Sequence, residues 1–357
     1  MVNNISSTPQ VNWHVIEELN ELRAIEPKWQ LLYEKSKLSF FNSPSWLLAW
    51  VDVFWQSQWQ LKVIAGYAGK ELVALAPFYV NVTNSKLSLK KLMPLGQGEP
   101  EEQEVMSEYQ DLLLYDVTDA DLVGLNKLIK QLEFDRLEWN HVLNDSKIGE
   151  FLKLFSSVEA IHNGYRYLVE CGIDAQQTKS ALKKWQRCSN KLADKKVLFN
   201  WSEPTEELWH KLALFHQNRW QNKKEKGAFS HVNFEKFHHH NGFAGGLKMS
   251  VMTINDDVVA INYFVLSDDT LHFYQSGWDE AFEEYAPGFC LHYWSIKNAI
   301  KDNYDLMISP TASMYKQRFC IDKPQATFNI SYGKWPLKHA MKKVIMKVKK
   351  MLLEQRK

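Results

Sequence analysis

Residues 247–278 read LKMSVMTINDDVVAINYFVLSDDTLHFYQSGW, and this stretch decides the fold. It holds three runs rich in β-branched and aromatic residues, separated by Asn255-Asp256-Asp257 and Ser267-Asp268-Asp269. Such runs, bounded by clusters of Asn, Asp and Ser, predict strands. Because the connections are so short, neighbouring strands must run antiparallel, as a meander. The expected strands are Leu247–Ile254, Val258–Leu266 and Thr270–Trp278.

The segments on either side of the meander alternate between helix and strand, which predicts an α/β domain. Thr205 is placed to cap the helix that it begins. Before the meander we expect a strand Tyr165–Val169, a helix Thr178–Lys196, a strand Val197–Trp201 and a helix Thr205–Asn222. After it we expect a helix Pro287–Asp302, a strand Asp305–Ser309, a short helix around Tyr315–Phe319 and a strand near Phe328–Tyr332.

The first half of the chain has its own set of helices and strands. Ser43 is placed to cap a helix and Pro44 suits its first position. The acidic segment Gly96–Tyr109 is expected to be a surface loop. The expected elements are Trp13–Ile16, Leu61–Gly66, Leu72–Val80, Asp111–Tyr115 and Arg136–Trp139 as strands, and Leu22–Lys35, Ser43–Phe54 and Asp121–Leu132 as helices. With a boundary near Asn163-Gly164, the predicted domains are 1–163, 164–335 and a separate tail, 336–357.

Composition indicates a folded protein with a sizeable core. The 357 residues are 45% hydrophobic and carry a formal net charge of +1, so nucleic acid is not favoured as the main partner. The four cysteines, Cys171, Cys188, Cys290 and Cys320, form no CxxC pair, and we expect free thiols in a reducing compartment. Met1–Gln10 lacks the features of a secretory signal, and no apolar stretch approaches about 18 residues. A cytoplasmic location is expected.

The tail differs from the rest in charge. Pro336–Lys357 contains eight Lys or Arg and one Glu, with apolar residues at helical spacing. Two interpretations remain open: an amphipathic helix packed on the body, or a helix in peripheral contact with anionic lipid at the inner face of a membrane.

Several motifs occur in a family-specific order. They are Phe215–Trp220 (FHQNRW), Lys226–Phe229, Val259–Phe264, Tyr274–Asp279, Ala286-Pro287-Gly288 and Tyr315–Phe319, preceded by Asn42–Trp46 and Glu108–Asp111 in the first half. In this order the chain resembles the CelD/BcsL-type acetyltransferases of the GNAT superfamily, relatives of the two-lobed FemAB enzymes. The resemblance covers roughly residues 41–332 and is most specific between 208 and 319.

The resemblance implies an α/β fold of two GNAT-like lobes, each a mixed, largely antiparallel sheet flanked by helices, plus a basic C-terminal helix. It implies an acyl-CoA-dependent N- or O-acyltransferase, with acetyl-CoA as the expected donor and no metal. The implied acceptor is a sugar or amino-sugar precursor of a surface polysaccharide. Two alternatives stay open: a FemAB-like aminoacyl transferase that uses aminoacyl-tRNA, and a catalytically degenerate scaffold of the same fold.

Donor binding is assigned to the start of the helix at Pro287. Its unpaired N–H groups and positive dipole end suit a pyrophosphate, and Gly288 would permit close approach. The alternative is a helix start with no ligand. The predicted cofactor-binding residues are Gln275, Ser276, Pro287, Gly288, Phe289 and Cys290.

Three residues are candidates for catalysis: Tyr315, Lys316 and His216. By position in the resembled family, Tyr315 would protonate the leaving thiolate, and Lys316 would bind an anion or stabilise an oxyanion. The pKa of a histidine lies near neutrality, which makes His216 a candidate base. A core tyrosine, a surface lysine and a helix histidine are the plain alternatives. Arg219, Trp220 and Trp278 are the predicted acceptor-binding residues.

Three further sequence features bear on the expected chemistry. The family has Gly and an acidic residue shortly before Tyr315-Lys316, whereas this chain has Thr311-Ala312. Three consecutive histidines, His238-His239-His240, point in different directions on a helix and do not favour a metal. Cys290 is not favoured as a nucleophile, because the resembled family transfers acyl groups directly.

Overall fold

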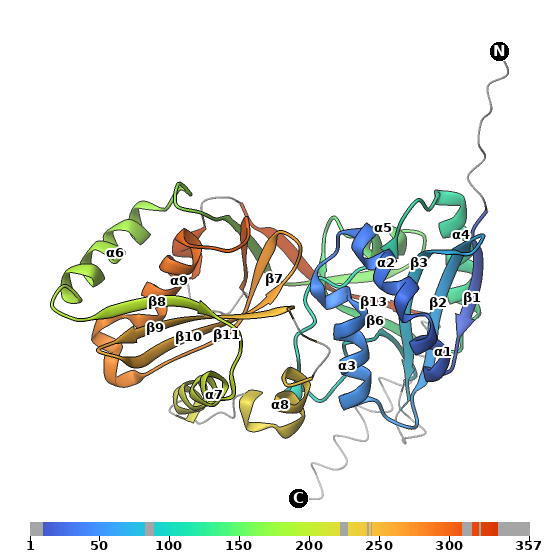
Figure 1. The fold of residues 1–357 in the computed structure, drawn as a ribbon. Coiled ribbons are helices and arrows are strands. Elements are labelled where there is room, and N and C mark those ends of the chain that lie inside the picture. Colours follow the sequence, from blue (N-terminus) through green and yellow to red (C-terminus); the bar gives the residue numbers. More distant parts are fainter. Residues whose placement is uncertain are drawn as a thin grey trace, which may run out of the picture. The chain divides into compact units, whose positions relative to one another are not determined.

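The structure is a computed structural model that describes residues 10–82, 89–221, 228–240, 243, 245–308, 316–320 and 323–334 (Figure 1). The chain forms two compact units. Unit 1 runs through Gly98, includes Val105–His162 and resumes at Phe328, while unit 2 contains Glu99–Glu104 and Asn163–Thr327. The change of unit after His162 lies one residue from the predicted boundary. Unlike the predicted division, the strand at Phe328 belongs to unit 1 and Glu99–Glu104 to unit 2.

The predicted meander forms the centre of the sheet in unit 2. Strands β9, β10 and β11 pair antiparallel, β8 adds to β9, and β12 pairs parallel with β11 and antiparallel with β7. The sheet is therefore mixed and largely antiparallel, as predicted. The bounds are β7 (Val158–Glu170), β8 (Val197–Ser202), β9 (Leu247–Ile254), β10 (Asp257–Leu266), β11 (Thr270–Trp278) and β12 (Asn303–Ile308).

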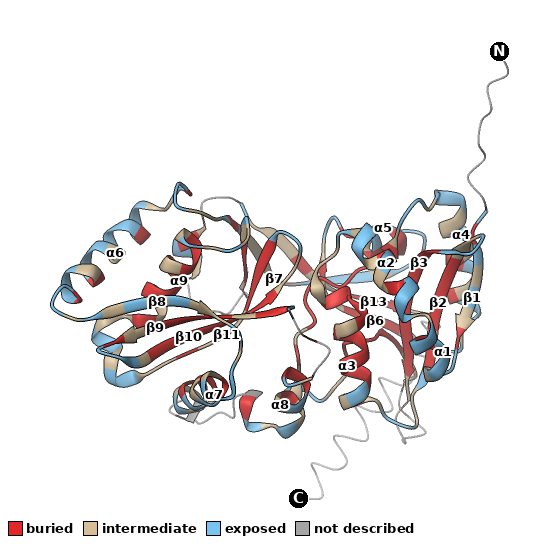
Figure 2. Cartoon of the chain, viewed as in Figure 1, coloured by how far each residue is buried: buried red, intermediate tan, exposed pale blue. Residues whose placement is uncertain are grey.

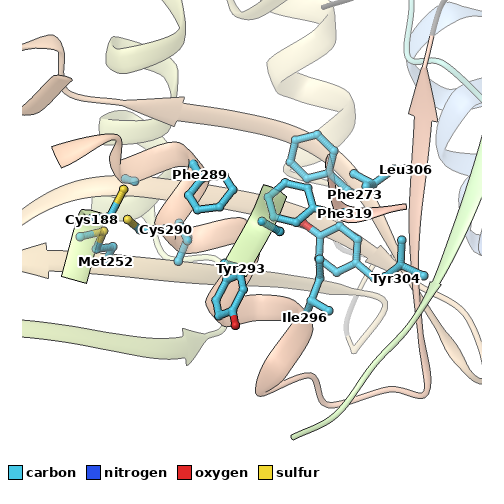
Figure 3. Close-up of a cluster of buried hydrophobic side chains, with 14 of the residues drawn as sticks. Cys188, Met252, Phe273, Phe289, Cys290, Tyr293, Ile296, Tyr304, Leu306 and Phe319 are labelled. Atoms are coloured by element: carbon cyan, nitrogen blue, oxygen red, sulfur yellow. The ribbon is translucent and has the colours of Figure 1, made fainter. Parts of the chain in front are cut away.

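Helices cover both faces of this sheet. Helix α9 lies on one face with α6, and α7 lies on the other. The core under α6 and α9 is aromatic, and Phe289 stacks on Phe319 with ring centroids 5.2 Å apart (Figure 3). The helices are α6 (Lys179–Lys191), α7 (Glu206–Gln221), α8 (Val232–His238) and α9 (Pro287–Lys297), with short 3₁₀ helices η2 (Glu101–Gln103), η3 (Ala228–Ser230), η5 (Glu280–Tyr285) and η6 (Lys316–Phe319).

Unit 1 repeats this topology. Its strands follow the order β1-β2-β3-β4-β6, antiparallel except for β4 and β6, and β5 pairs with β3. Nine of the eleven residues of β3 are buried, so both faces of the sheet are covered (Figure 2). The strands are β1 (Asn12–Ile16), β2 (Gln60–Ala68), β3 (Glu71–Asn81), β4 (Lys91–Pro94), β5 (Leu113–Leu114) and β6 (Arg136–Leu143). The helices are α1 (Leu19–Ala24), α2 (Glu26–Ser36), α3 (Pro44–Phe54), α4 (Asp119–Gln131), α5 (Lys147–Leu152) and the 3₁₀ helix η1 (Phe40–Asn42).

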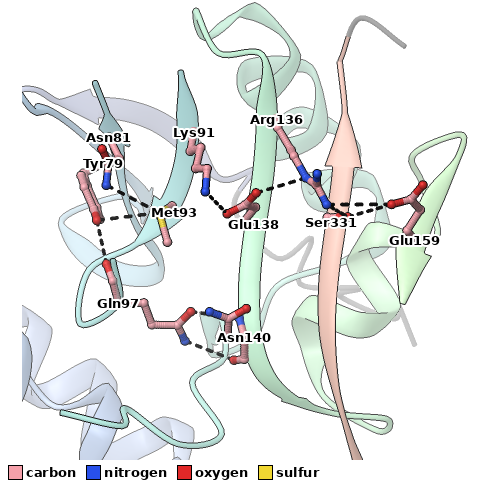
Figure 4. Close-up of polar contacts among 10 residues, drawn as sticks. All are labelled: Tyr79, Asn81, Lys91, Met93, Gln97, Arg136, Glu138, Asn140, Glu159 and Ser331. Atoms are coloured by element: carbon pink, nitrogen blue, oxygen red, sulfur yellow. Dashed lines mark hydrogen bonds and ion pairs between the residues drawn. The ribbon is translucent and has the colours of Figure 1, made fainter. Parts of the chain in front are cut away.

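Two strands, β7 and β13 (Gln325–Gly333), each pass from one unit into the other, and β13 reaches unit 1 from a remote part of the chain. After α5 the chain enters β7, whose second half pairs with β12 in unit 2. After η6 the chain enters β13, whose second half joins β6 in unit 1. There Arg136 Nη2 donates to Ser331 Oγ at 2.8 Å, and His141 N donates to Asn329 Oδ1 at 3.3 Å (Figure 4). Unit 1 is therefore not one continuous stretch of sequence.

Four local predictions need correction. The helix predicted over Leu22–Lys35 is two helices, because Pro27 lies in the first turn of a new one. The strand predicted over Asp111–Tyr115 shrinks to two residues, and β4 and α5 were missed. The segment predicted as a surface loop is buried at its second end, where Val105, Ser107 and Glu108 have at most 6% of their surface exposed.

The predicted tail helix at 336–357 lies outside the described residues. Within them, no helix is long and apolar enough to cross a membrane.

Candidate active site

The strands β11 and β12 diverge after a short parallel pairing. They pair only over Thr270–His272 and Asn303–Asp305. Beyond this, β12 continues to pair with β7 as far as Ile308, and β11 continues to pair with β10 as far as Trp278. Within the described residues, the facing edges of Phe273–Trp278 and Leu306–Ile308 thus form no ladder with each other. Such an edge offers N–H and C=O groups to an extended ligand.

A β-bulge marks the point of divergence. Tyr263 pairs with Gln275 and Phe264 with Phe273, so Tyr274 is an extra residue in β11. A bulge bends its strand and re-aims the side chains that follow. Phe273 packs under α9, with its ring 4.6 Å from that of His292, whereas the Tyr274 ring lies 5.0 Å from that of His238, which ends α8.

Lys316 lies where the strands separate. Its Nζ donates to the carbonyl of Met307 on β12 at 3.0 Å and lies 4.8 Å from the ring centroid of Phe273 on β11. Burial, reinforced by the charge of Lys316, lowers the pKa of His292 to about 3. Lys316 thus places an ammonium group between the two diverging strands. The plain alternative of a solvated surface lysine does not fit these contacts.

The first turn of α9 lies beside the end of β11. Ala286 precedes it with φ 50° and ψ 54°, a left-handed conformation that costs a non-glycine residue roughly 1–3 kcal/mol. No side chain caps the helix, and Pro287 at its first position has no N–H. Gly288 faces Trp278: a Cβ added at residue 288 would lie 3.1 Å from Cδ1 of that indole. The predicted donor residues on α9 and the indole of Trp278 are therefore close together.

A basic cavity of about 530 Å³ borders this helix start. One wall is α6, which contributes most of the positive charge, and Ala286 contributes backbone from the other side. Lys191 Nζ also donates to the carbonyl of Glu284 at 2.9 Å. Five cations and one carboxylate border the cavity, namely Lys183, Lys184, Arg187, Lys191, Arg318 and Glu284. A cavity of this charge, next to a helix N-terminus, is suited to a polyanion.

Helix α7 contacts the opposite face of β11. A Cβ at Gly277 would lie 2.7 Å from Cβ of Phe215 and 2.9 Å from the carbonyl oxygen of Leu212, so this close packing requires glycine. His216 is 6% exposed, and burial followed by the charge of Arg219 lowers its pKa to about 4. His216 is therefore neutral at pH 7.

Side chains alternate across a strand, so the predicted residues of β11 fall into two groups. Ser276 shares a face with Trp278, towards α9. Gln275 shares the face of Gly277, towards α7 and His216.

A buried ion network holds the base of the diverging strands, and the sequence analysis missed it. Asp305 Oδ2 accepts from Arg166 Nε at 2.7 Å and lies 3.0 Å from Nδ1 of His272, whose Nε2 lies 2.7 Å from Ser267 Oγ. Burial acts to raise the pKa of Asp305, but Arg166 and His272 together lower it below its usual range. Because β7, β12 and β11 supply these residues, the network ties three strands together. The order of the strands brings these three residues together, so their spacing in the sequence did not indicate the network.

Some predicted site residues lie outside the described residues. These are Tyr315 and Thr311-Ala312, the positions where the resembled family has Gly and an acidic residue. The side chain of Trp220 is also not described. Their roles stay predictions.

The three histidines are each engaged differently. His238 Nδ1 lies 3.1 Å from the hydroxyl of Tyr263, and His239 Nδ1 lies 3.3 Å from a carboxylate oxygen of Glu206. The ring of His240 contacts Phe243. Within the described part of the chain, no group of three or more His, Cys, Asp or Glu residues is arranged to hold a metal.

In unit 1 the two early motifs meet in a buried polar cluster. Asp111 N donates to Asn42 Oδ1 at 2.7 Å, and Trp46 Nε1 donates to Ser107 Oγ at 2.9 Å. The carboxylate of Asp111 accepts three backbone N–H groups, from Leu112, Lys147 and Ile148, at 2.6–2.8 Å. Gln97 extends the cluster, since its Oε1 accepts from Asn140 N at 2.9 Å (Figure 4).

Residues 179–317 match the model of the acetyltransferase (GNAT) domain. A search of curated proteins found no match. Among solved structures, FemX has a TM-score of 0.58 at 9% identity, covering 92% of this chain and 100% of its own. The C-terminal domain of a putative lysylphosphatidylglycerol synthetase from Agrobacterium fabrum has a TM-score of 0.55 at 8% identity, covering 89% and 94%. L-PGS from Bacillus licheniformis has 0.52 at 11%, covering 92% and 97%.

At these identities the structural likeness shows a shared fold, and the matched domain supplies the chemistry. The matched domain defines the chain as an acyltransferase of the GNAT fold. Its acetyltransferase-type domain occupies residues 179–317.

Proposed function

We propose that the protein is an acyl-CoA-dependent N- or O-acyltransferase that holds the phosphates of its donor in the basic cavity between α6 and α9. One observation carries this proposal: five cations border a cavity that reaches Ala286, at the uncapped start of α9. A phosphomonoester carries about −1.5 to −2 charges at neutral pH, and the pyrophosphate of CoA adds more. Charge and dipole thus favour the same ligand at the same place.

The acyl group would lie between the diverging ends of β11 and β12. A thioester carbonyl there would lie beside strand edges that form no ladder with each other, and the ammonium group of Lys316 would stabilise negative charge developing on its oxygen. Attack by an amine or hydroxyl requires a proton acceptor, a role for which neutral His216 is the candidate. Tyr315, one residue before Lys316, is the candidate acid for the departing thiolate.

The acceptor follows from the resemblance to CelD/BcsL-type enzymes. We propose a sugar or amino-sugar precursor of a surface polysaccharide, with acetyl as the transferred group. Arg219, Trp220 and Trp278 are its candidate contacts.

A second candidate is aminoacyl transfer from aminoacyl-tRNA, as in FemAB-type enzymes. The likeness to the fold of FemX and the basic face of α6 favour it. Both candidates place a polyanion in the same cavity, so only the identity of the donor separates them.

Calorimetric titration with acetyl-CoA, longer acyl-CoAs, free CoA and aminoacyl-tRNA tests the donor. Arg187→Ala removes a cation that borders the cavity, and Lys179→Ala is the matched control on α6, because Lys179 does not border it. Loss of a phosphate contact worth about 1.5–3 kcal/mol weakens binding by roughly 10- to 150-fold. We expect this loss for Arg187→Ala with an acyl-CoA and less than about a twofold change for Lys179→Ala.

Two results would refute the proposal in different ways. Equal weakening by both variants places the donor elsewhere. No binding of any CoA species, together with tight binding of aminoacyl-tRNA, replaces the first candidate with the second.

A further inference from the structure

Two thiols meet where α6 packs against α9. Cys188 on α6 and Cys290 on α9 belong to the same buried core cluster, where their side chains lie next to each other (Figure 3). Cys290 is fully buried, and its Sγ also lies 3.4 Å from the carbonyl oxygen of Tyr285. Cys188 is 5% exposed and borders the basic cavity. One thiol of the pair is therefore accessible from the cavity, and the other lies behind it.

The surroundings favour a thiolate at Cys188 over one at Cys290. Interaction with the Cys290 thiol lowers the pKa of Cys188, burial opposes the shift, and the charges of Lys184 and Lys191, which border the same cavity, reinforce it. For Cys290, interaction with the Cys188 thiol and burial both raise the pKa. Cations and a hydrogen-bond donor beside a sulfur are the general conditions for a reactive thiolate.

The other two cysteines lack these surroundings. Burial raises the pKa of both Cys171 and Cys320 to about 12. They are half-buried and thus more exposed than Cys188, which makes them internal controls for reactivity set by charge rather than by access.

We propose that Cys188 and Cys290 form an oxidisable dithiol, in which a hydroperoxide oxidises Cys188 and Cys290 then closes a disulfide between α6 and α9. The attacking thiolate lies at the border of a cavity that a small peroxide can enter. Its partner is a neighbour in the same core cluster. The proposal does not depend on the acyl donor.

The oxidation takes place in two steps that conserve atoms and electrons. The thiolate of Cys188 attacks one oxygen of hydrogen peroxide, an S–O bond forms, the O–O bond breaks, and the departing hydroxide takes a proton to become water. Oxidation removes the thiolate that held the proton on Cys290. The sulfur of Cys290 then attacks the sulfenic sulfur, an S–S bond forms, the S–O bond breaks, and the second hydroxide leaves as water with the proton of Cys290. Two thiols are oxidised and one peroxide is reduced to two waters.

A disulfide here would act on the helix start that borders the cavity. Cys290 lies in the first turns of α9, where its N–H donates to the carbonyl of Ala286 at 3.1 Å. Oxidation would tie that turn to α6 and remove one negative charge from the border of the cavity.

Peptide mapping of the full chain after titration with hydrogen peroxide tests the proposal. We expect a linked Cys188–Cys290 peptide pair, an intact mass lower by about 2 Da, and reversal by dithiothreitol. In Cys290→Ser, dimedone should trap a sulfenic acid on Cys188. At pH 7, iodoacetamide should label Cys188 at least about tenfold faster than Cys171 or Cys320.

Other patterns of oxidation or labelling would refute the proposal. If Cys171 or Cys320 is oxidised or alkylated first, or if no Cys188–Cys290 peptide forms while other thiols are consumed, the proposal is wrong. The map of the unsubstituted chain decides this, so the result stands even where a cysteine variant fails to fold.

Discussion

Replacing Gly277 with alanine is the sharpest test of how α7 packs on β11. The new Cβ would lie 2.7 Å from Cβ of Phe215 and 2.9 Å from the carbonyl oxygen of Leu212, whereas ordinary contacts begin near 3.4 Å. Helix α7 must therefore move by several tenths of an ångström. Such overpacking costs about 1–3 kcal/mol. For a unit of this size, each kcal/mol lowers Tm by about 2–4 °C, so we expect a loss of roughly 2–12 °C.

Scanning calorimetry of the full chain measures the loss, and acyl-CoA titration reports the site. Gly333→Ala is the matched control: it also lies in a strand, and a Cβ there meets nothing within 4 Å. The control should melt within about 1 °C of the unsubstituted protein, since surface substitutions have small effects. If Gly277→Ala melts as high as the control, α7 does not contact β11 as described and the placement of His216 is wrong.

Three further predictions concern buried charge and pH. Burial lowers the pKa of His216 to about 4, whereas in the unfolded chain the side chain takes up a proton near pH 6.5. The free energy of unfolding should therefore fall as the pH is lowered from 6.5 towards 4. In urea titrations, His216→Gln should show a weaker dependence of this free energy on pH. Arg166→Leu leaves Asp305 buried without its cation and should cost about 3–5 kcal/mol, which adding Asp305→Asn should partly restore. Lys316→Ala should lower kcat about 10²- to 10³-fold while the Kd for CoA changes less than about twofold; a large change in Kd alone would assign Lys316 to donor binding instead.

Local sequence patterns predicted the centre of unit 2 because residues close together in sequence determine its strands and turns. The alternation of Leu247–Trp278 and its two polar turns produce the meander with bounds correct to one residue. The cap at Ser43 also forms as predicted, since its Oγ accepts from Trp46 N at 3.2 Å. Failures occurred where a tertiary partner overrides the local pattern. Asp111 precedes apolar residues and resembles a strand start, but its carboxylate instead accepts N–H groups at the start of α5.

The candidate site was predictable only along single segments. The start of α9 was visible from Pro287-Gly288, and Lys316 from its motif. The cations of α6 lie on a single helix, but nothing in the sequence shows that Ala286 lies across a cavity from them. Arg166, His272 and Asp305 come from three strands that are remote in sequence. Their ion network follows from strand order, which no single segment contains.

The shared strands have a consequence for synthesis on the ribosome. Unit 1 has all its other strand residues by His162, but β13, which completes it, emerges roughly 160 residues later. At about 5–20 residues per second, this interval lasts on the order of 8–32 s. During that time the edge of β6 has no partner from β13, and an unpaired edge invites pairing with other chains. Arg136 and Glu138, which form an ion pair on β6, place charges on this strand, and charged residues on an unpaired edge disfavour such pairing.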